Sequence, residues 1–355
     1  MQTLRWDVFC RVIDNHGDLG VCWRLARQLA GRGQIVRLWV DDPAALSWMA
    51  PAGAANVELV RWTLQPPLLA PGDVVVEAFG CDPPAAFVTA MAQARPAPLW
   101  INLEYLSAEP YVERCHGLPS PQLSGPAHGL LKWFFYPGFN ARTGGLLRED
   151  GLAEQRQAFA ATAWLNAQGI TTDPGERRIS VFCYADAGLA DFIDALPPTP
   201  TLWLLAPGAA RQQVHEVLAA SHRLAAWRCV DLPWLSQPDY DRLLWSCELN
   251  VVRGEDSLVQ ALWAGTAFVW QIYAQRDGAH AVKLRAFLDL YLRDAAPALA
   301  VPLRSLWLAF NRLAPGPCDW PDSLAWQAHA QAWRNRLWTQ ADLATQLLRF
   351  VEERR

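Results

Sequence analysis

The sequence lacks the features that mark a membrane protein, a secreted protein or a nucleic-acid-binding protein. No apolar run among its 355 residues approaches the ~18 residues of a membrane-spanning helix. The N-terminus carries no apolar segment followed by small residues, as a signal peptide would. Charged residues make up only 19% of the chain and sum to −4, so there is no basic excess to hold nucleic acid or an anionic membrane over a broad face. We therefore expect a cytoplasmic protein that binds neither nucleic acid nor a membrane directly.

Signatures of metal and redox sites are missing as well. The eight cysteines include no pair at C-x-x-C spacing, which excludes a zinc ribbon and a thioredoxin-like motif. No G-x-G-x-x-G segment follows the first strand of either half, which argues against an oxidoreductase. Several cysteines lie inside apolar runs, where thiol side chains pack as small core residues in a reducing compartment. We expect neither a bound metal nor a cofactor.

What the chain does have is a high apolar content in short alternating segments. Hydrophobic residues make up 52% of the sequence, which excludes disorder, and the length predicts two to three domains of about 150 residues. Apolar stretches predict strands at residues 6–13, 34–40, 57–62, 73–80, 99–103, 179–184, 201–205, 224–230, 248–252 and 267–271. Amphipathic stretches predict helices at residues 21–30, 44–50, 84–94, 153–167, 189–196, 210–220, 237–246, 258–264 and 340–353.

This alternation predicts an α/β protein with two doubly wound, Rossmann-like domains. The pattern breaks at residues 104–150, which we expect to be a long loop region with one or two short strands. We place one domain at residues 1–172, with a C-terminal helix at 340–355 packing back on it. The other domain is expected at residues 176–338.

Two such domains facing across a cleft match the GT-B type of inverting glycosyltransferase. In that plan the acceptor binds the first domain and a nucleotide-sugar binds the second. Two turns, one after Ile13 and one after Val252, connect the carboxyl end of a predicted strand to a helix. Doubly wound sheets bind their ligands at such connections. Periplasmic binding proteins, small-molecule kinases and sugar-nucleotide epimerases share the plan, so it does not decide the function.

The turn at residues 253–257 has the sequence RGEDS and enters a helix. Ser257, followed by Gln260 three residues later, predicts a capping box. The N–H groups of the first helical turn and the helix dipole would then favour an anion. Gly254 lets the backbone approach a phosphate closely, and Arg253 can add a charged, fork-shaped contact to a diphosphate. The turn therefore predicts a site for a leaving diphosphate that needs no metal.

Aromatic residues in the same half indicate a place for a flat base. Phe182 and Tyr184 alternate at the end of a predicted strand, and Gln237 and Tyr240 lie near a helix start. A base could stack between such rings while Gln237 bonds its edge. Plainer interpretations stay open for both features. The rings could be ordinary core and rim residues, and the RGEDS turn could only cap its helix, with its arginine paired to the glutamate two positions on.

The turn after the first predicted strand offers carboxylates. Asp14 and Asp18 lie four positions apart in a loop where Gly17 and Gly20 leave room for a substrate. One carboxylate can act as a general base that its neighbours tune. Asp14 could instead be a turn residue and Asp18 a helix N-cap, or the pair could hold Mg²⁺. His16 between them is expected to be solvated.

Three segments together resemble one family. The segment FCRVIDNHGDLGVCWRLARQLA at residues 9–30 resembles the opening of the EarP family, and RGEDS at 253–257 and WQIYAQ at 270–275, with His280, resemble its second signature. Members of this family are bacterial protein-arginine rhamnosyltransferases that act on translation elongation factor P. The resemblance implies a GT-B fold, a dTDP-β-L-rhamnose donor, inversion at the sugar carbon, and an arginine of elongation factor P as the acceptor.

The resemblance also implies roles by position. Asp18 resembles the proposed general base and Asp14 its essential partner, and Glu255 matches an acid needed for activity. Phe182 and Tyr240 match rings that sandwich thymine, although relatives are expected to carry Phe at position 240. The donor-binding residues that the resemblance implies are Asn15, Gly17, Phe182, Tyr184, Gln237, Tyr240, Arg253, Asp256 and Ser257.

The expected chemistry follows from the acceptor. A guanidinium is a poor nucleophile because it is charged and its pKa lies above about 12. Paired carboxylates could bind it and direct one nitrogen at the sugar carbon, so we expect an acidic acceptor pocket. Residues 104–107, which follow the predicted strand at 99–103, could line the acceptor side, and Glu109 and Glu113 are further acids of the same region. Which aspartate takes the proton stays open, as does whether Glu255 acts on the sugar, the diphosphate or Arg253. A glycosyltransferase with another donor or acceptor and a non-catalytic nucleotide-sugar sensor remain alternatives.

Overall fold

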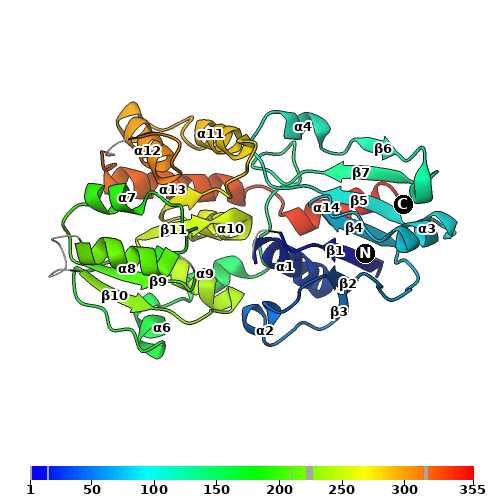
Figure 1. Cartoon of the computed structure of the whole chain (residues 1–355), viewed down its shortest axis with the longest axis horizontal. Helices are drawn as coiled ribbons and strands as arrows, with labels where there is room; N and C mark the ends of the chain where they lie inside the picture. The colour runs from blue at the N-terminus through cyan, green and yellow to red at the C-terminus, as the bar shows by residue number, and fades with distance from the viewer. Residues whose placement is uncertain (1, 14–15, 209, 221–226, 316–318) are drawn as a thin grey trace. The chain divides into compact units, whose positions relative to one another are not determined.

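The computed structural model shows two compact units, each built around one sheet. The first unit comprises Met1–Asp150 and Thr339–Arg355, and the second comprises Gly151–Trp338 (Figure 1). The residues that the structure describes are 2–13, 16–208, 210–220, 227–315 and 319–355. Both units combine parallel strands with helices, so the predicted α/β class is confirmed.

The first unit ends earlier in the chain than the predicted boundary at residue 172. Residues 151–172 belong to the second unit. The reason is apolar packing, because Leu165 and Ile170 are buried in one cluster with Leu202 of the second unit's sheet. The segment after Asp150 therefore folds onto the second sheet rather than extending the first unit.

The sheet of the first unit has seven strands in the order β3-β2-β1-β4-β5-β7-β6. The strands are β1 (Arg5–Cys10), β2 (Ile35–Val40), β3 (Val57–Arg61), β4 (Val74–Ala78), β5 (Leu99–Leu103), β6 (Pro119–Pro121) and β7 (Leu131–Phe135). All neighbours are parallel except β6 and β7, which come from the predicted loop region. All five residues of β4 are buried, which is typical of a sheet covered on both faces.

The strand order places a switch point between β1 and β4. Strands β2 and β4 lie on opposite sides of β1, so the connections that follow β1 and β4 leave the sheet in opposite directions. In doubly wound sheets the ligand binds at this point, at the carboxyl ends of the strands. The residues that follow β1, β4 and β5 therefore decide what the first unit can bind.

The C-terminal helix belongs to the core of the first unit. The helices of this unit are α1 (Gly17–Gly31), α2 (Leu46–Met49), α3 (Ala85–Gln93), α4 (Tyr111–Cys115), the 3-10 helix η1 (Gly125–Ala127) and α14 (Leu343–Glu352). In Figure 1 the red α14 lies among the blue and cyan elements of the first unit. Its Leu343, Leu347, Leu348 and Val351 are buried in one cluster with Trp6 and other residues of β1 and α1.

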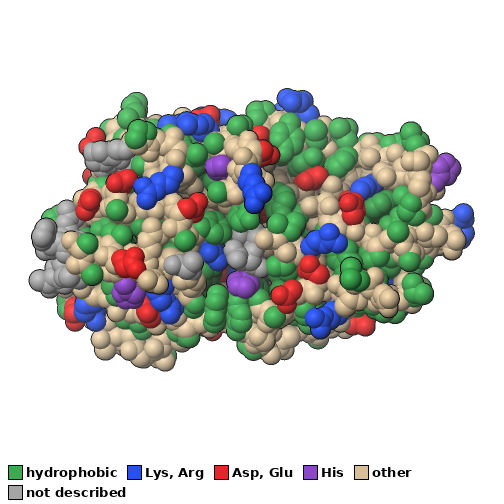
Figure 2. All heavy atoms as spheres, in the orientation of Figure 1, with side chains coloured by type: hydrophobic (Ala, Val, Ile, Leu, Met, Phe, Trp, Pro, Cys, Tyr) green, Lys and Arg blue, Asp and Glu red, His purple; other side chains and the backbone are tan. Residues whose placement is uncertain are grey.

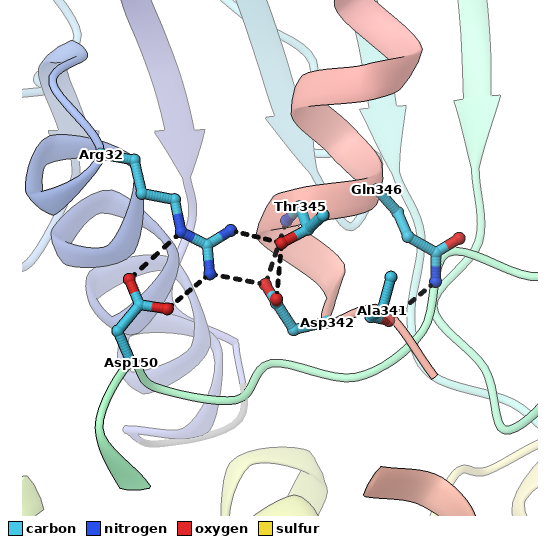
Figure 3. A network of polar contacts seen from close by, with 6 residues as sticks. All are labelled: Arg32, Asp150, Ala341, Asp342, Thr345 and Gln346. Atoms are coloured by element: carbon cyan, nitrogen blue, oxygen red, sulfur yellow. Dashed lines mark hydrogen bonds and ion pairs between the residues drawn. The ribbon is translucent and has the colours of Figure 1, made fainter. Parts of the chain in front are cut away.

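One arginine of the first unit contacts residues at both connections between the units. Arg32 follows α1, and its guanidinium contacts Asp150, the last residue before the chain leaves the first unit, at 2.8 Å. The same guanidinium contacts Asp342 at 3.0 Å and donates to Thr345 Oγ1 at 2.9 Å, just after the chain returns (Figure 3). Asp342 also caps α14, because its carboxylate accepts the backbone N–H of Thr345 at 3.0 Å.

The sheet of the second unit has five parallel strands in the order β10-β9-β8-β11-β12. The strands are β8 (Arg177–Val181), β9 (Thr201–Leu205), β10 (Trp227–Asp231), β11 (Leu249–Arg253) and β12 (Ala267–Gln271). The part of the predicted strand at 224–230 that precedes Trp227 lies outside the described residues. The switch point of this sheet lies between β8 and β11, so residues after Val181 and after Arg253 meet there.

The helices of the second unit follow the predicted alternation with two corrections. They are α5 (Leu152–Gln157), α6 (Ala161–Ala167), α7 (Leu189–Ala195), α8 (Ala210–Ala220), α9 (Gln237–Trp245), α10 (Gly254–Ala264), α11 (Ala279–Tyr291), α12 (Pro297–Phe310) and α13 (Ser323–Trp338). The predicted helix at 153–167 is wrong as one element, because it breaks where Phe159 packs its ring against Trp245. Helix α10 begins at Gly254, four residues before the predicted start.

The surface charges, the helices and the cysteines can be compared with what the composition predicted, which was no broad basic face, no membrane-spanning helix and cysteines packed in the core. On the face shown in Figure 2, the described Lys and Arg side chains stand between acidic and apolar ones and form no broad basic area. None of the helices in the described part of the chain has the length and apolar character needed to cross a membrane. Cys10, Cys22 and Cys183 are buried and free, as predicted for core residues.

Candidate active site

Asp18 lies at the carboxyl edge of the first sheet, next to its switch point. It is the second residue of α1, which begins at Gly17, so the predicted helix start at residue 21 is four residues late. Asp18 is not the N-cap, since His16 takes that position. The Asp18 side chain is only 3% exposed, and its Oδ2 accepts the backbone N–H of Ile13 at 2.9 Å. A carboxylate in the first turn is also stabilised by the helix dipole.

An aromatic residue that follows β5 contacts this carboxylate, and another that follows β4 stacks on the ring of the first. Tyr105 follows β5, and its hydroxyl donates to Asp18 Oδ1 at 3.3 Å. The Tyr105 ring stacks on Phe79, which follows β4, with 4.2 Å between ring centroids and 13° between planes. The sequence indicated residues 104–107 as part of the acceptor side but missed Phe79, whose position directly after the switch-point strand was the available signal.

Of residues 14–17 in this turn, the structure describes His16 and Gly17. Asp14 and Asn15 lie outside the described residues. Gly17 is the first residue of α1. His16 packs edge-on against Trp48 at 5.3 Å between centroids, a contact that was not expected for a solvated loop histidine.

The acids of the predicted acceptor side all have partners in the structure. Glu104 accepts from Asn102 Nδ2 at 2.8 Å, and Glu109 accepts from the Ser107 hydroxyl at 2.9 Å. Glu113 accepts from Asn140 Nδ2 at 2.7 Å and pairs with an arginine.

The charge of Glu104 affects the neighbouring tyrosines. Burial raises the pKa of Tyr111 and of Tyr136, and Glu104 raises both further. Burial is the larger cause of both shifts, and the part that Glu104 adds shows that its negative charge acts on the residues around the carboxyl ends of β5 and β7. Such an environment attracts a cation rather than a phosphate.

The turn at the second switch point is a direct passage from strand to helix. Arg253 ends β11 and is the N-cap of α10, and Gly254 begins the helix with a left-handed φ of 62°. Trp270 Nε1 donates to the Gly254 carbonyl at 2.8 Å and fixes this turn from β12. The predicted capping box is therefore wrong. Ser257 lies inside the first turn, where its Oγ accepts the Arg253 N–H at 3.2 Å and donates to the Arg253 carbonyl.

The Arg253 guanidinium lies over two aromatic rings. Its carbon is 4.1 Å from the ring centroid of Phe182 and 4.6 Å from that of Tyr184, both within cation–π distance. Its Nη1 donates to the Cys183 carbonyl at 3.4 Å. No carboxylate of the described chain lies within ion-pair distance of it, so the alternative pairing with Glu255 is not found. The charge of Arg253 is available to an anion at the switch point.

Two further predicted donor residues contact each other. Gln237 begins α9, is 4% exposed and donates from Nε2 to Asp256 Oδ2 at 3.3 Å. Asp256 lies in the first turn of α10, so the contact joins the starts of two helices. A Gln237 amide with one fixed donor has a defined orientation for the edge of a base.

The two rings predicted to sandwich a base are not parallel in the structure. Phe182 and Tyr240 meet edge to face, with 5.8 Å between centroids and 67° between planes. A flat base can lie between them only after one ring turns. Burial raises the pKa of the Tyr240 hydroxyl, so this side chain stays neutral and serves as a ring. The sandwich stays a prediction.

No group of three or more His, Cys, Asp or Glu side chains that could hold a metal ion is present among the described residues. Asp14, one half of the alternative Mg²⁺ pair, lies outside them. Metal independence therefore stays a prediction. At the second switch point, Arg253 and the start of α10 are groups that an anion could contact.

Comparisons with known proteins agree on one family. Residues 6–352 match the family described as elongation factor P (EF-P) rhamnosyltransferase EarP. The chain is 42% identical to a protein-arginine rhamnosyltransferase of Pseudomonas aeruginosa over 98% of this chain and 99% of the relative. It is 43% identical to the Pseudomonas putida protein of the same name over 97% of this chain and 98% of the relative.

Solved structures agree as well. A structure described as the basis for EarP-mediated arginine glycosylation of translation elongation factor EF-P covers 99% of each chain, with 32% identity and a TM-score of 0.66. The spinosyn rhamnosyltransferase SpnG, at 12% identity and a TM-score of 0.51, shares the fold alone. The predicted GT-B type is thereby confirmed. Matching signatures, two doubly wound sheets and relatives along its whole length show that the chain belongs to the EarP family.

Proposed function

We propose that this protein transfers L-rhamnose from dTDP-β-L-rhamnose to an arginine side chain of translation elongation factor P, with inversion at the sugar carbon. The observation that carries the proposal is the family match over residues 6–352. Relatives at 42% and 43% identity are named protein-arginine rhamnosyltransferases. The two switch points support it, because one is acidic and the other presents an arginine.

The acidic edge suits an arginine acceptor. A guanidinium has a pKa above about 12 and needs a carboxylate to localise its charge and direct one nitrogen. Asp18 is well placed for this role, because its carboxylate is fixed by the Ile13 N–H and by Tyr105. In the proposed step the guanidine nitrogen bonds to the sugar carbon, and Asp18 takes the N–H proton. The electron pair of the broken sugar–oxygen bond leaves with dTDP.

The arginine edge suits the donor. The first N–H groups of α10 and the charge of Arg253 would stabilise the diphosphate as it leaves. Asp256 orients Gln237 for the thymine edge, and Phe182 offers a ring face. Glu255 lies in the first turn of α10 and is assigned to the transfer step by its position in the family signature. No metal is needed in this scheme.

The test is the intact mass of purified elongation factor P after incubation with this protein and dTDP-rhamnose, with and without a metal chelator. The expected result is a gain of one deoxyhexose, mapped to an arginine by peptide sequencing, in both conditions. A gain only without chelator would show that a metal is needed. No gain while calorimetry still detects dTDP binding would favour another acceptor or a nucleotide-sugar sensor. An acceptor that acts in translation also supports our proposal of a cytoplasmic location.

A further inference from the structure

Both oxygens of the Asp18 carboxylate have a partner from a different part of the first unit. Oδ2 accepts the Ile13 N–H at 2.9 Å, and Oδ1 accepts the Tyr105 hydroxyl at 3.3 Å. Two contacts on opposite oxygens fix the plane of a carboxylate. A carboxylate oxygen can accept more than one hydrogen bond, so these two contacts do not by themselves exclude a bond from a substrate N–H. Tyr105 therefore limits the directions from which Asp18 can take a proton.

Tyr105 is itself fixed by a residue in an unusual backbone conformation. Phe79 stacks on the Tyr105 ring at 4.2 Å and 13°, and its φ is 59°. A left-handed φ is rare for a bulky residue and costs free energy. The Phe79 N–H donates to the Leu103 carbonyl at 2.7 Å, so the strained residue is tied to the end of β5, two residues before Tyr105. Strain of this kind persists where the surroundings enforce it, and it is concentrated at functional sites.

We propose that Tyr105 is a positioning residue for Asp18, and that Phe79 holds the Tyr105 ring in place for this purpose. This inference rests on the proposed function, in which Asp18 is the general base. Tyr105 acts through Asp18 and needs no contact with the substrate. Its hydroxyl orients the carboxylate toward the acceptor nitrogen and stabilises its charged form before the proton is transferred.

The length of the contact limits the size of the effect. An O–H···O bond is usually shorter than 3.3 Å, but hydrogen bonds of catalytic groups are often long until the substrate binds. We therefore expect Tyr105→Phe, which keeps the ring and its stack and removes only the hydroxyl, to lower kcat about tenfold, which corresponds to ~1.4 kcal/mol in the barrier. The KM for the donor and the dTDP affinity should stay within about twofold of the wild-type values.

The experiment compares the wild-type protein with Tyr105→Phe, Phe79→Leu and the control Thr89→Val. The rate of mass gain of elongation factor P provides kcat and KM, calorimetry provides the dTDP affinity, and thermal unfolding provides Tm. Phe79→Leu removes the stack and keeps a bulky apolar residue, so it should also lower kcat at unchanged dTDP affinity. Thr89→Val removes an exposed hydroxyl from α3 of the same unit and should leave kcat unchanged.

The outcomes separate this inference from the proposed function. A wild-type protein that leaves elongation factor P unmodified contradicts the proposed function, and the role of Tyr105 falls with it. A wild-type protein that modifies it, with Tyr105→Phe at the same kcat, overturns the inference alone. A parallel loss of dTDP affinity and Tm in Tyr105→Phe would also overturn it, because that pattern shows a structural role. If Tyr105→Phe does not fold, the kcat of Phe79→Leu decides.

Discussion

At the scale of single residues, the two sheets carry side chains of opposite charge at their switch points. Asp18 is a buried carboxylate at the start of a helix, with both oxygens fixed. Arg253 is a guanidinium stacked on aromatic rings at the start of another helix. A transfer from a nucleotide-sugar to a guanidine needs both groups, because the acceptor is a cation and the leaving group is an anion.

Asp18→Asn should abolish transfer and leave donor binding nearly intact. The amide has almost the shape of the carboxylate but cannot take a proton, and loss of a general base typically costs about 10²- to 10⁴-fold in rate. Mass spectrometry of elongation factor P measures the rate, and calorimetry with dTDP measures donor binding. Asp289→Asn, which removes an exposed acid of α11, is the matched control. A loss of dTDP affinity in Asp18→Asn would contradict the assignment.

Arg253→Ala should mainly weaken dTDP binding. A hydrogen bond to a charged group contributes about 1.5–3 kcal/mol, so the dissociation constant should rise about 10- to 100-fold. Titration calorimetry with dTDP measures this change. Arg293→Ala, which removes an exposed arginine just after α11, should have no effect. An unchanged affinity in Arg253→Ala would rule out its phosphate role.

At the scale of elements, the starts of helices decide where the functional groups stand. Helix α10 begins directly at the end of β11, because Gly254 adopts a left-handed φ of 62° and Trp270 of β12 bonds its carbonyl. Helix α14 follows its N-cap Asp342, which accepts the Thr345 N–H and pairs with Arg32. In both places a residue distant in the sequence completes the helix start.

Arg32→Gln should destabilise the first unit by about 2 kcal/mol at neutral pH, since it leaves the nearly buried Asp342 without its cation. The Arg32 guanidinium also lowers the pKa of Asp150 below its usual value. A lowered folded-state pKa contributes stability above the unfolded value near 3.9, and this contribution disappears as pH falls through the folded value. The difference in Tm between wild type and Arg32→Gln should therefore be largest at pH 7.

Thermal unfolding at pH 7 and at pH 3 measures that difference. It should shrink at pH 3, because the stability that the lowered pKa of Asp150 contributes is lost as the pH falls from the unfolded value near 3.9 toward the lower folded value. Arg293→Gln, at an exposed position with no carboxylate of the described residues within ion-pair distance, should have the same Tm as the wild type at both pH values. A Tm difference for Arg32→Gln that is the same at pH 3 would show that the ion pairs do not contribute.

At the scale of the whole molecule, the chain completes its first unit with its last residues. It leaves the first unit after Asp150 and returns at Thr339, and α14 then fills part of the core beside β1 and α1. The first unit therefore cannot finish folding until the second has been synthesised. Arg32 contacts both connections between the units, at Asp150 where the chain leaves the first unit and at Asp342 after it comes back.

Leu347→Ala should show that the stability of the first unit depends on the packing of α14. Leu347 is fully buried in the cluster of the first unit, and deleting a buried leucine side chain typically costs about 2–5 kcal/mol. Urea denaturation measures the loss in the free energy of unfolding. Leu324→Ala is the matched control, because Leu324 is 82% exposed in α13 and should lose almost nothing. Equal losses for the two variants would place α14 outside the core.

The sequence by itself determined the elements, the α/β class and the family. Apolar segments such as 73–80 and 248–252 form strands because their alternation with amphipathic helices reports local periodicity, which needs no knowledge of distant contacts. The signature at 253–257 indicated the site of Arg253. These features depend on neighbouring residues along the chain, so a single sequence contains them.

Only the tertiary structure decided the contacts that complete the site. Tyr105 and Asp18 are 87 residues apart in the sequence. They meet because only β4 separates β1 from β5 in the sheet, so the residues that follow these two parallel strands lie at the same edge. The start of α10 depends on Trp270, 16 residues from Gly254, and the boundary after Asp150 depends on where Leu165 is buried. Strand order and burial are properties of the packed chain, and local periodicity carries no information about them.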